Sequence, residues 1–86
     1  MPPRSHVLVT APQLGSILQA ARKARGMTQS ALAARLGLSQ SRVSYLELSP
    51  HDLSLAQLLA WCSTLGLELT IDARGSAAAP GMQADW

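Results

Sequence analysis

The side chains of this sequence that are best suited to chemistry gather between residues 40 and 46. They are short or planar groups that donate and accept hydrogen bonds, namely Gln40, Ser41, Arg42, Ser44 and Tyr45. No acidic residue precedes Glu47. A helix that only packs in a bundle exposes mostly Glu and Lys, whereas contact with phosphates and base edges requires hydrogen-bonding groups free of negative charge. The segment therefore predicts a DNA-reading surface.

A helix-turn-helix motif is predicted to position these side chains. Counted from Gln29, positions four, eight, ten, fifteen and eighteen are apolar: Leu32, Leu36, Leu38, Val43 and Leu46. Position five, where the two helices approach each other, is Ala33, and position nine, where the turn favours a positive φ, is Gly37. Two helices of any bundle would share the apolar positions, so the exposed face decides in favour of DNA reading.

The surrounding pattern predicts a mainly α domain of four or five helices over residues 11–66. Apolar residues three and four apart give a first helix from about residue 12 to 25. Thr28 and Ser39 are suitable N-caps for the second and third helices, which run to about Leu36 and Glu47. A loop follows at 48–52, and a capping box from Ser54 to Gln57 then opens a fourth helix. We expect the buried face of that helix to consist of Leu55, Leu58, Leu59, Cys62 and Leu65.

The segment after Gly66 has a different period. Residues 67–72 alternate strictly between apolar and polar, which predicts one half-buried strand whose apolar face is Leu67, Leu69 and Ile71. A lone strand leaves its N–H and C=O groups unpaired, so it needs either the stretch Val7–Val9 or the same strand of a second copy. Residues 1–10 are interpreted as an arm or short strand, and we expect residues 73–86 to be a disordered tail.

Composition limits the functions that are open to the chain. Its 86 residues allow one domain with a small core, and the net charge of +2 is only mildly basic. The single Cys62 excludes an internal disulfide and a Cys-based zinc cluster, and no apolar run is long enough to span a bilayer. No acid pair, nucleophile with a base or glycine-rich phosphate loop occurs, so we expect no catalysis, metal or cofactor. These features favour a cytoplasmic protein.

The stretches Thr28–Ala33 and Gly37–Ser44 resemble the phage-repressor-like (Cro/C1, XRE-type) helix-turn-helix family, and the resemblance covers roughly residues 12–66. It implies that Gln29 touches phosphate and braces Gln40, whose amide reads adenine. It also implies that Arg42 contacts either guanine or phosphate. The remaining residues of the expected DNA-binding set are Ser30, Ser39, Ser41, Ser44 and Tyr45, of which Ser39 is first of all an N-cap.

The same resemblance implies an ion pair between Arg22 and Glu47 in preference to a DNA contact by Arg22. For some other polar and aromatic residues the sequence leaves two interpretations open, and for the two histidines it predicts no functional role. Lys23, Arg25 and Arg35 face either phosphates or solvent, His6 and His51 are expected in solvated loops, and Trp61 lies in the core or a dimer interface.

A narrower resemblance rests on the order of the elements. The chain is similar to HipB-type antitoxins in the order of its elements: the helix-turn-helix motif, the fourth helix, the strand Leu67–Asp72 and a tail ending in Trp86. This resemblance implies a homodimer with paired strands, a palindromic operator, repression of its own operon and binding of a HipA-type serine/threonine kinase toxin. Trp86 is expected to contact the toxin, because Trp is favoured as an interface anchor. The alternatives are a stand-alone phage-like or restriction-controller repressor and a protein-binding adaptor with a helix-turn-helix fold.

Overall fold

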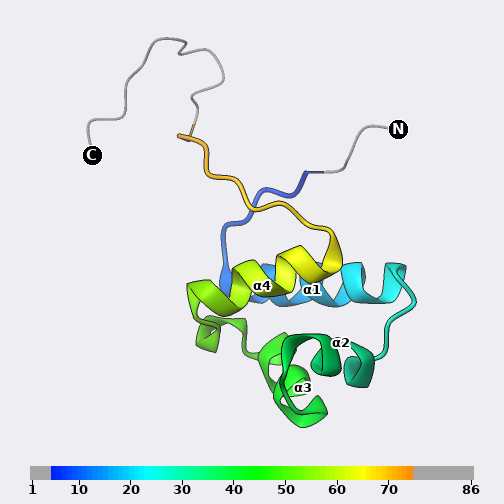
Figure 1. The fold of residues 1–86 in the computed structure, drawn as a ribbon. Coiled ribbons are helices and arrows are strands. Elements are labelled where there is room, and N and C mark those ends of the chain that lie inside the picture. Colours follow the sequence, from blue (N-terminus) through cyan, green and yellow to red (C-terminus); the bar gives the residue numbers. More distant parts are fainter. Residues whose placement is uncertain (1–4, 75–86) are drawn as a thin grey trace.

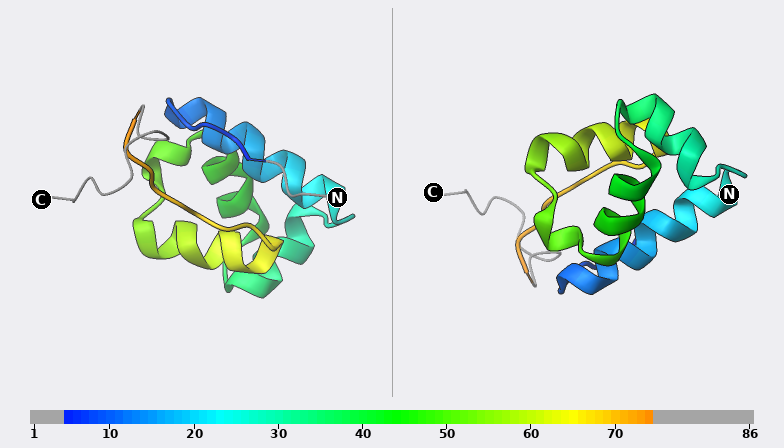
Figure 2. Two further views of the ribbon diagram at one scale, coloured as in Figure 1. Left: turned by 90° about the horizontal axis from the view of Figure 1, so that it is seen from above. Right: turned by 90° about the horizontal axis from the view of Figure 1, so that it is seen from below.

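The structure is a computed structural model that describes residues 5–74 of the chain. Its elements are α1 (Ala11–Ala24), α2 (Gln29–Leu36), α3 (Gln40–Leu48), the short 3-10 helix η1 (Pro50–Asp52) and α4 (Leu55–Leu65). Helices α1 and α4 form one layer, and α2 and α3 lie beneath it (Figure 1). Seen from above, α3 lies beneath and between α1 and α4 (Figure 2). The predicted mainly helical fold is confirmed.

The core is built from apolar side chains that all four helices contribute. Its fully buried members are Leu18 from α1, Leu32 from α2, Val43 and Leu46 from α3, and Trp61 from α4. Ala33, which is 3% exposed, lies where α2 meets the rest of the core. The motif positions predicted as apolar therefore pack as expected, and Trp61 is a core residue.

Local signals set the ends of the two motif helices. The Oγ1 of Thr28 accepts a hydrogen bond from the N–H of Ala31 at 3.0 Å, and the Oγ of Ser39 accepts one from the N–H of Arg42 at 3.1 Å. Both bonds satisfy N–H groups that the first turn of a helix leaves without partners. Gly37 ends α2 with a φ of +70°, a conformation that glycine adopts without steric cost. The predicted capping roles of Thr28 and Ser39 are thus confirmed.

Gly15 allows α1 to approach α3 and η1 very closely. A Cβ at this position would lie 2.3 Å from the carbonyl oxygen of Glu47 and 3.3 Å from the ring of Pro50. Because backbone cannot yield as a flexible side chain can, a larger residue would push α1 away. Pro50 itself is buried, so the chain after α3 is held firmly against α1.

The sequence prediction needs correction at two helical features. The expected loop at 48–52 is the end of α3 followed by the 3-10 turn η1. On α4, Leu55 and Leu59 are 65% and 48% exposed, although both were expected on the buried face. The bulky Trp61 occupies the middle of the buried stripe together with Leu58 and Leu65, and Leu55 and Leu59 are therefore displaced to its edge.

The strand expected at Leu67–Asp72 is absent from the described part of this single chain. Leu67 packs against the core, but exposure rises along the alternation to 38% at Leu69 and 92% at Ile71. Within residues 5–74, no backbone hydrogen bond joins this segment to Val7–Val9. The physical reason is that a strand requires a hydrogen-bonded neighbour. Most of the expected tail, including Trp86, lies outside the described residues.

Candidate nucleic-acid interface

A buried ion pair links the first helix to the end of the recognition helix. The Nε of Arg22 lies 2.7 Å from one carboxylate oxygen of Glu47, and its Nη2 donates to the other oxygen at 3.2 Å. A third donor of the same guanidinium, Nη1, reaches the carbonyl of Met27 at 2.9 Å. Both residues are 6% exposed. The resemblance implied this pair, and the geometry explains it, since a planar guanidinium matches a carboxylate through two parallel hydrogen bonds.

Glu47 also orients the side-chain amide of Gln29 through a hydrogen bond. The Nε2 of Gln29 donates to Glu47 at 3.0 Å, so the carboxylate is shared between α1 and α2. The Oε1 of Gln29 then accepts a hydrogen bond from the Nε2 of Gln40 at 2.7 Å. A continuous chain of hydrogen bonds therefore runs from the buried Arg22 to the exposed Gln40 at the start of α3.

The polarity of this chain follows from the acceptor-only character of a carboxylate. Because Glu47 cannot donate, Gln29 must turn its NH₂ group toward Glu47 and its carbonyl oxygen toward Gln40. Gln40 must then turn its own NH₂ group toward Gln29. The exposed Gln40 keeps two further groups for a ligand, the acceptor Oε1 and the second N–H donor of Nε2. Such a pair matches the N6 and N7 edge of adenine.

A second arrangement lies one turn further along α3. The hydroxyl of Tyr45 donates to Oδ2 of Asp52 in η1. The guanidinium carbon of Arg42 lies 5.3 Å from the centre of the Tyr45 ring, within the range of a cation–π interaction. The hydrogen bond and negative charge of Asp52 raise the pKa of Tyr45 above its ordinary value, and Arg42 opposes this rise.

The predicted DNA-binding residues lie together on the surface formed by α3 and the ends of α2. Gln29 and Ser44 are half-buried, and the others are exposed: Ser30, Ser39, Gln40, Ser41, Arg42 and Tyr45. The Oγ atoms of Ser39 and Ser41 lie 3.3 Å apart. Sequence reasoning missed Asp52, because it lies seven positions after Tyr45, beyond the turn at Pro50. It also missed the contact between Glu47 and Gln29.

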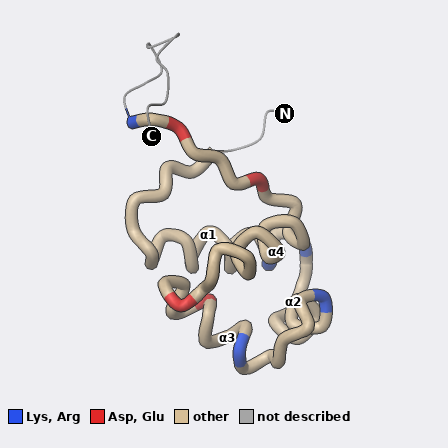
Figure 3. The backbone as a smooth tube through the Cα atoms, turned by 60° about the vertical axis from the view of Figure 1, so that its left-hand side comes forward, with Lys and Arg blue, Asp and Glu red and all other residues tan. Residues whose placement is uncertain are grey.

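Charge is distributed unevenly over the described residues. Lys23, Arg25 and Arg35 are exposed, as are His6 and His51. Figure 3 shows the cationic positions of α2 and α3 at one end of the molecule, where acidic positions also lie near α3, whereas the segment after α4 carries both acidic and basic positions at the other end. Exposed cations beside the recognition helix favour an approach of phosphate, since phosphate neutralisation supplies much of the affinity of DNA-binding proteins.

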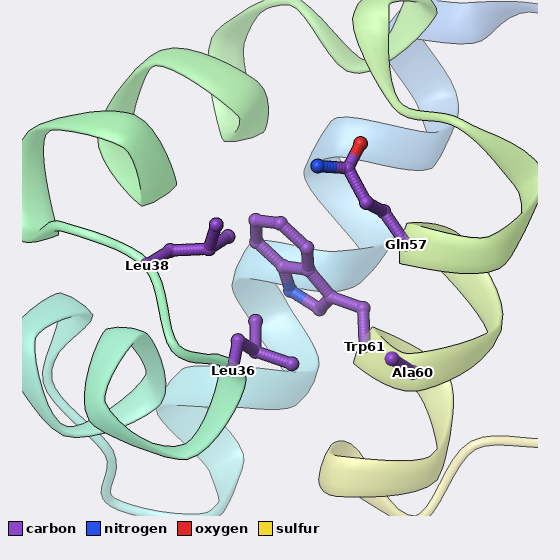
Figure 4. Close-up of a pocket in the computed structure, with 5 residues that line it drawn as sticks. All are labelled: Leu36, Leu38, Gln57, Ala60 and Trp61. Atoms are coloured by element: carbon purple, nitrogen blue, oxygen red, sulfur yellow. The ribbon is translucent and has the colours of Figure 1, made fainter.

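A shallow hollow lies between α4 and the turn that joins α2 to α3. Figure 4 shows its lining, with the indole of Trp61 facing Leu36 and Leu38. Its cavity volume is about 50 Å³, far below the roughly 300–1,000 Å³ of typical small-molecule sites. The described residues contain no group of His, Cys, Asp and Glu that suits a metal ion, and none of their helices is long and apolar enough to cross a membrane.

A family model described as Helix-turn-helix matches residues 18–71, which is more than half of the chain. The chain belongs to this family. The match begins in α1 and ends in the segment after α4, so it includes both helices of the motif and the whole Arg22–Gln40 chain of hydrogen bonds. Membership identifies a DNA-binding regulator, not an enzyme. No curated protein sequence gives a significant match.

Among solved structures, the chain is similar to chains of HipB complexes. A chain of the "Structure of HipA-HipB-O2-O3 complex" is 26% identical with a TM-score of 0.72, and the match covers 80% of this chain and 97% of that one. A chain of a "HipB-O1-O2 complex" gives the same identity and TM-score and is covered completely. The resemblance to HipB-type helix-turn-helix proteins stated from the sequence is thereby confirmed.

Proposed function

We propose that this protein is a sequence-specific transcriptional repressor that reads operator DNA with the N-terminal half of α3. The observation that carries this proposal is the orientation of Gln40, which the bonds from Arg22 through Glu47 and Gln29 set in advance. A preset amide loses little conformational entropy on binding, and a bidentate amide–adenine pair discriminates by about 1–3 kcal/mol. Ser41 and Arg42 are exposed beside Gln40 and contact neighbouring bases or phosphates.

The proposed repressor acts as a homodimer whose second copy covers the layer opposite α3. Support comes from large apolar side chains that are exposed on α4 and in the segment after it. They include Leu55 at 65%, Leu69 at 38% and Ile71 at 92% exposure. In the dimer, residues 67–72 of two copies pair as strands through Leu67, Leu69 and Ile71, which supplies the missing hydrogen-bond partners. Two recognition helices then face a palindromic operator about one helical turn, or roughly 34 Å, apart.

We further propose that the protein is the antitoxin of a HipA-type serine/threonine kinase and represses the operon that encodes both. The similarity to a chain of the HipA-HipB-O2-O3 complex supports this role, because that complex contains HipA together with HipB. Trp86 is proposed as a kinase contact, since tryptophan is favoured at the centre of interfaces. Its placement lies outside the described residues.

DNA reading is tested by selection of duplexes from a random-sequence library with the full-length chain. We expect one enriched palindrome with half-sites separated by about 10–10.5 base pairs or a multiple of that spacing. Affinity for the enriched duplex should fall steeply as salt is added. Absence of any enriched sequence would overturn the proposal in favour of a protein-binding adaptor. Enrichment of a single half-site by a monomeric protein would overturn the dimer alone.

The antitoxin role is tested by co-purification with a HipA-type kinase from the same genome. We expect the full chain to retain the kinase, and both Trp86→Ala and a chain shortened after Arg74 to lose it while still binding the selected duplex. Retention of the kinase by both variants would exclude Trp86 as a contact. Failure of the full chain to bind would leave a stand-alone repressor as the function.

A further inference from the structure

Asp52 stands in an unusual position for a DNA-binding surface. It is an exposed acid next to the recognition helix, although negative charge near phosphate opposes DNA binding. Its Oδ2 accepts the hydroxyl proton of Tyr45, and Tyr45 presents its ring to Arg42 at 5.3 Å. Asp52 is therefore joined to Arg42 through the side chain of Tyr45, because Asp52 binds its hydroxyl group and Arg42 lies over its ring.

The segment that carries Asp52 is firmly positioned. Pro50 is buried, and α1 approaches η1 at Gly15, where a Cβ would lie 3.3 Å from the proline ring. The N–H of Asp52 donates to the carbonyl of Ser49 at 3.0 Å, and the N–H of Leu53 donates to that of Pro50 at 3.0 Å. The turn therefore holds the Asp52 backbone in one place relative to α3.

We propose that Asp52 is a positioning residue for DNA recognition, which fixes the ring of Tyr45 so that the ring holds the Arg42 guanidinium ready to contact DNA. This inference rests on the proposed DNA-reading function. Contact with a ring attracts the guanidinium without neutralising it, whereas a carboxylate placed directly on Arg42 would compete with phosphate. The Tyr45 hydroxyl, whose proton is engaged by Asp52, contributes no donor to the DNA.

The experiment separates the hydrogen bond of Asp52 from its charge. Asp52→Asn and Asp52→Ala remove the same charge, but only the asparagine retains an oxygen that accepts the Tyr45 hydroxyl. Affinity is measured for the duplex that the wild-type chain selects from a random library. We expect Asp52→Ala to bind that duplex about 3- to 10-fold more weakly than Asp52→Asn, the range for loss of one hydrogen bond.

Two further backgrounds test the route through Tyr45 and Arg42. In Tyr45→Phe, which keeps the ring and removes the hydroxyl, the difference between the Asn and Ala variants should disappear. It should also disappear in Arg42→Ala, because nothing remains for the ring to position. Thermal unfolding of each variant measures its change in stability. If Asp52 acted only by stabilising the fold, the loss of affinity in each variant would follow its loss of stability.

Two results would overturn the positioning role of Asp52. One is equal DNA affinity of the Asp52→Asn and Asp52→Ala variants, and the other is a difference between them that persists in Tyr45→Phe or in Arg42→Ala. A difference that simply follows the loss of folded protein would also overturn it. A wild-type chain that selects no duplex would overturn the proposed function and this inference together, whereas selection with equal Asn and Ala variants overturns this inference alone.

Discussion

Gln40 and Gln29 face each other across the helix-turn-helix, with the Nε2 of Gln40 2.7 Å from the Oε1 of Gln29. Gln29 is in turn bonded to the buried Glu47. The exposed amide that is expected to meet a base is thus connected to the core through a single intermediate side chain. Substitutions of Gln40 and Gln29 should therefore change DNA discrimination, whereas substitution of Arg22 should change the stability of the core.

Gln40→Ala should remove about 1–3 kcal/mol of discrimination at one base pair of the selected operator, because the bidentate amide pairing is lost. Gln29→Ala should remove part of the same discrimination by freeing Gln40, and the double variant should add little to Gln40→Ala. Competition binding with single-base operator variants measures both effects. Gln19→Ala on α1 is the matched control and should leave preference unchanged. Full additivity of the two changes would contradict the coupling.

Arg22→Met should lower the free energy of unfolding by about 3–5 kcal/mol, since Glu47 would remain buried without its partner. Urea unfolding followed by circular dichroism measures this loss. The paired change Arg22→Met with Glu47→Leu should recover most of the stability, because no uncompensated charge remains. It should not recover DNA discrimination, because Gln29 loses its acceptor. A double variant that read DNA normally would contradict the bracing role of Glu47.

Ile71→Asp should convert the proposed dimer to a monomer and weaken operator binding. The side chain is 92% exposed in the single chain, so the folded monomer should keep its stability. Sedimentation measures the oligomeric state. Thr70→Asp, on the polar face of the same alternation, is the control and should remain dimeric. Identical sedimentation of the two variants would exclude paired strands at 67–72 as the dimer contact.

The chain has one tyrosine, so phenolate absorbance reports Tyr45 alone. Asp52 raises the pKa of this phenol in the folded protein above its ordinary value of 10.0. A group whose pKa is raised by folding stabilises the protein below its unfolded pKa, and this contribution is lost as pH rises through the folded pKa. We expect Asp52→Ala to lower the pKa of Tyr45 toward 10.0. An unchanged titration would show that Asp52 and Tyr45 do not interact in solution.

The sequence by itself determined the helices and the identity of the motif. Caps such as Thr28 and Ser39 and the turn glycine Gly37 act on backbone within a few residues, so local patterns suffice to predict them. The apolar spacing of the motif likewise determined which side chains enter the core, because each helix must bury one stripe. The ion pair of Arg22 with Glu47 was accessible only through resemblance to a family.

The tertiary structure decided what depends on neighbours distant in sequence. On α4, Trp61 is buried, whereas Leu55 and Leu59 are exposed, and only the packing of α4 against the other helices reveals this. The bond of Asp52 to Tyr45 depends on the turn at Pro50, which α1 holds in place. The alternation at 67–72 predicted a strand, but a strand forms only against a hydrogen-bonded neighbour, and the described residues of one chain supply none.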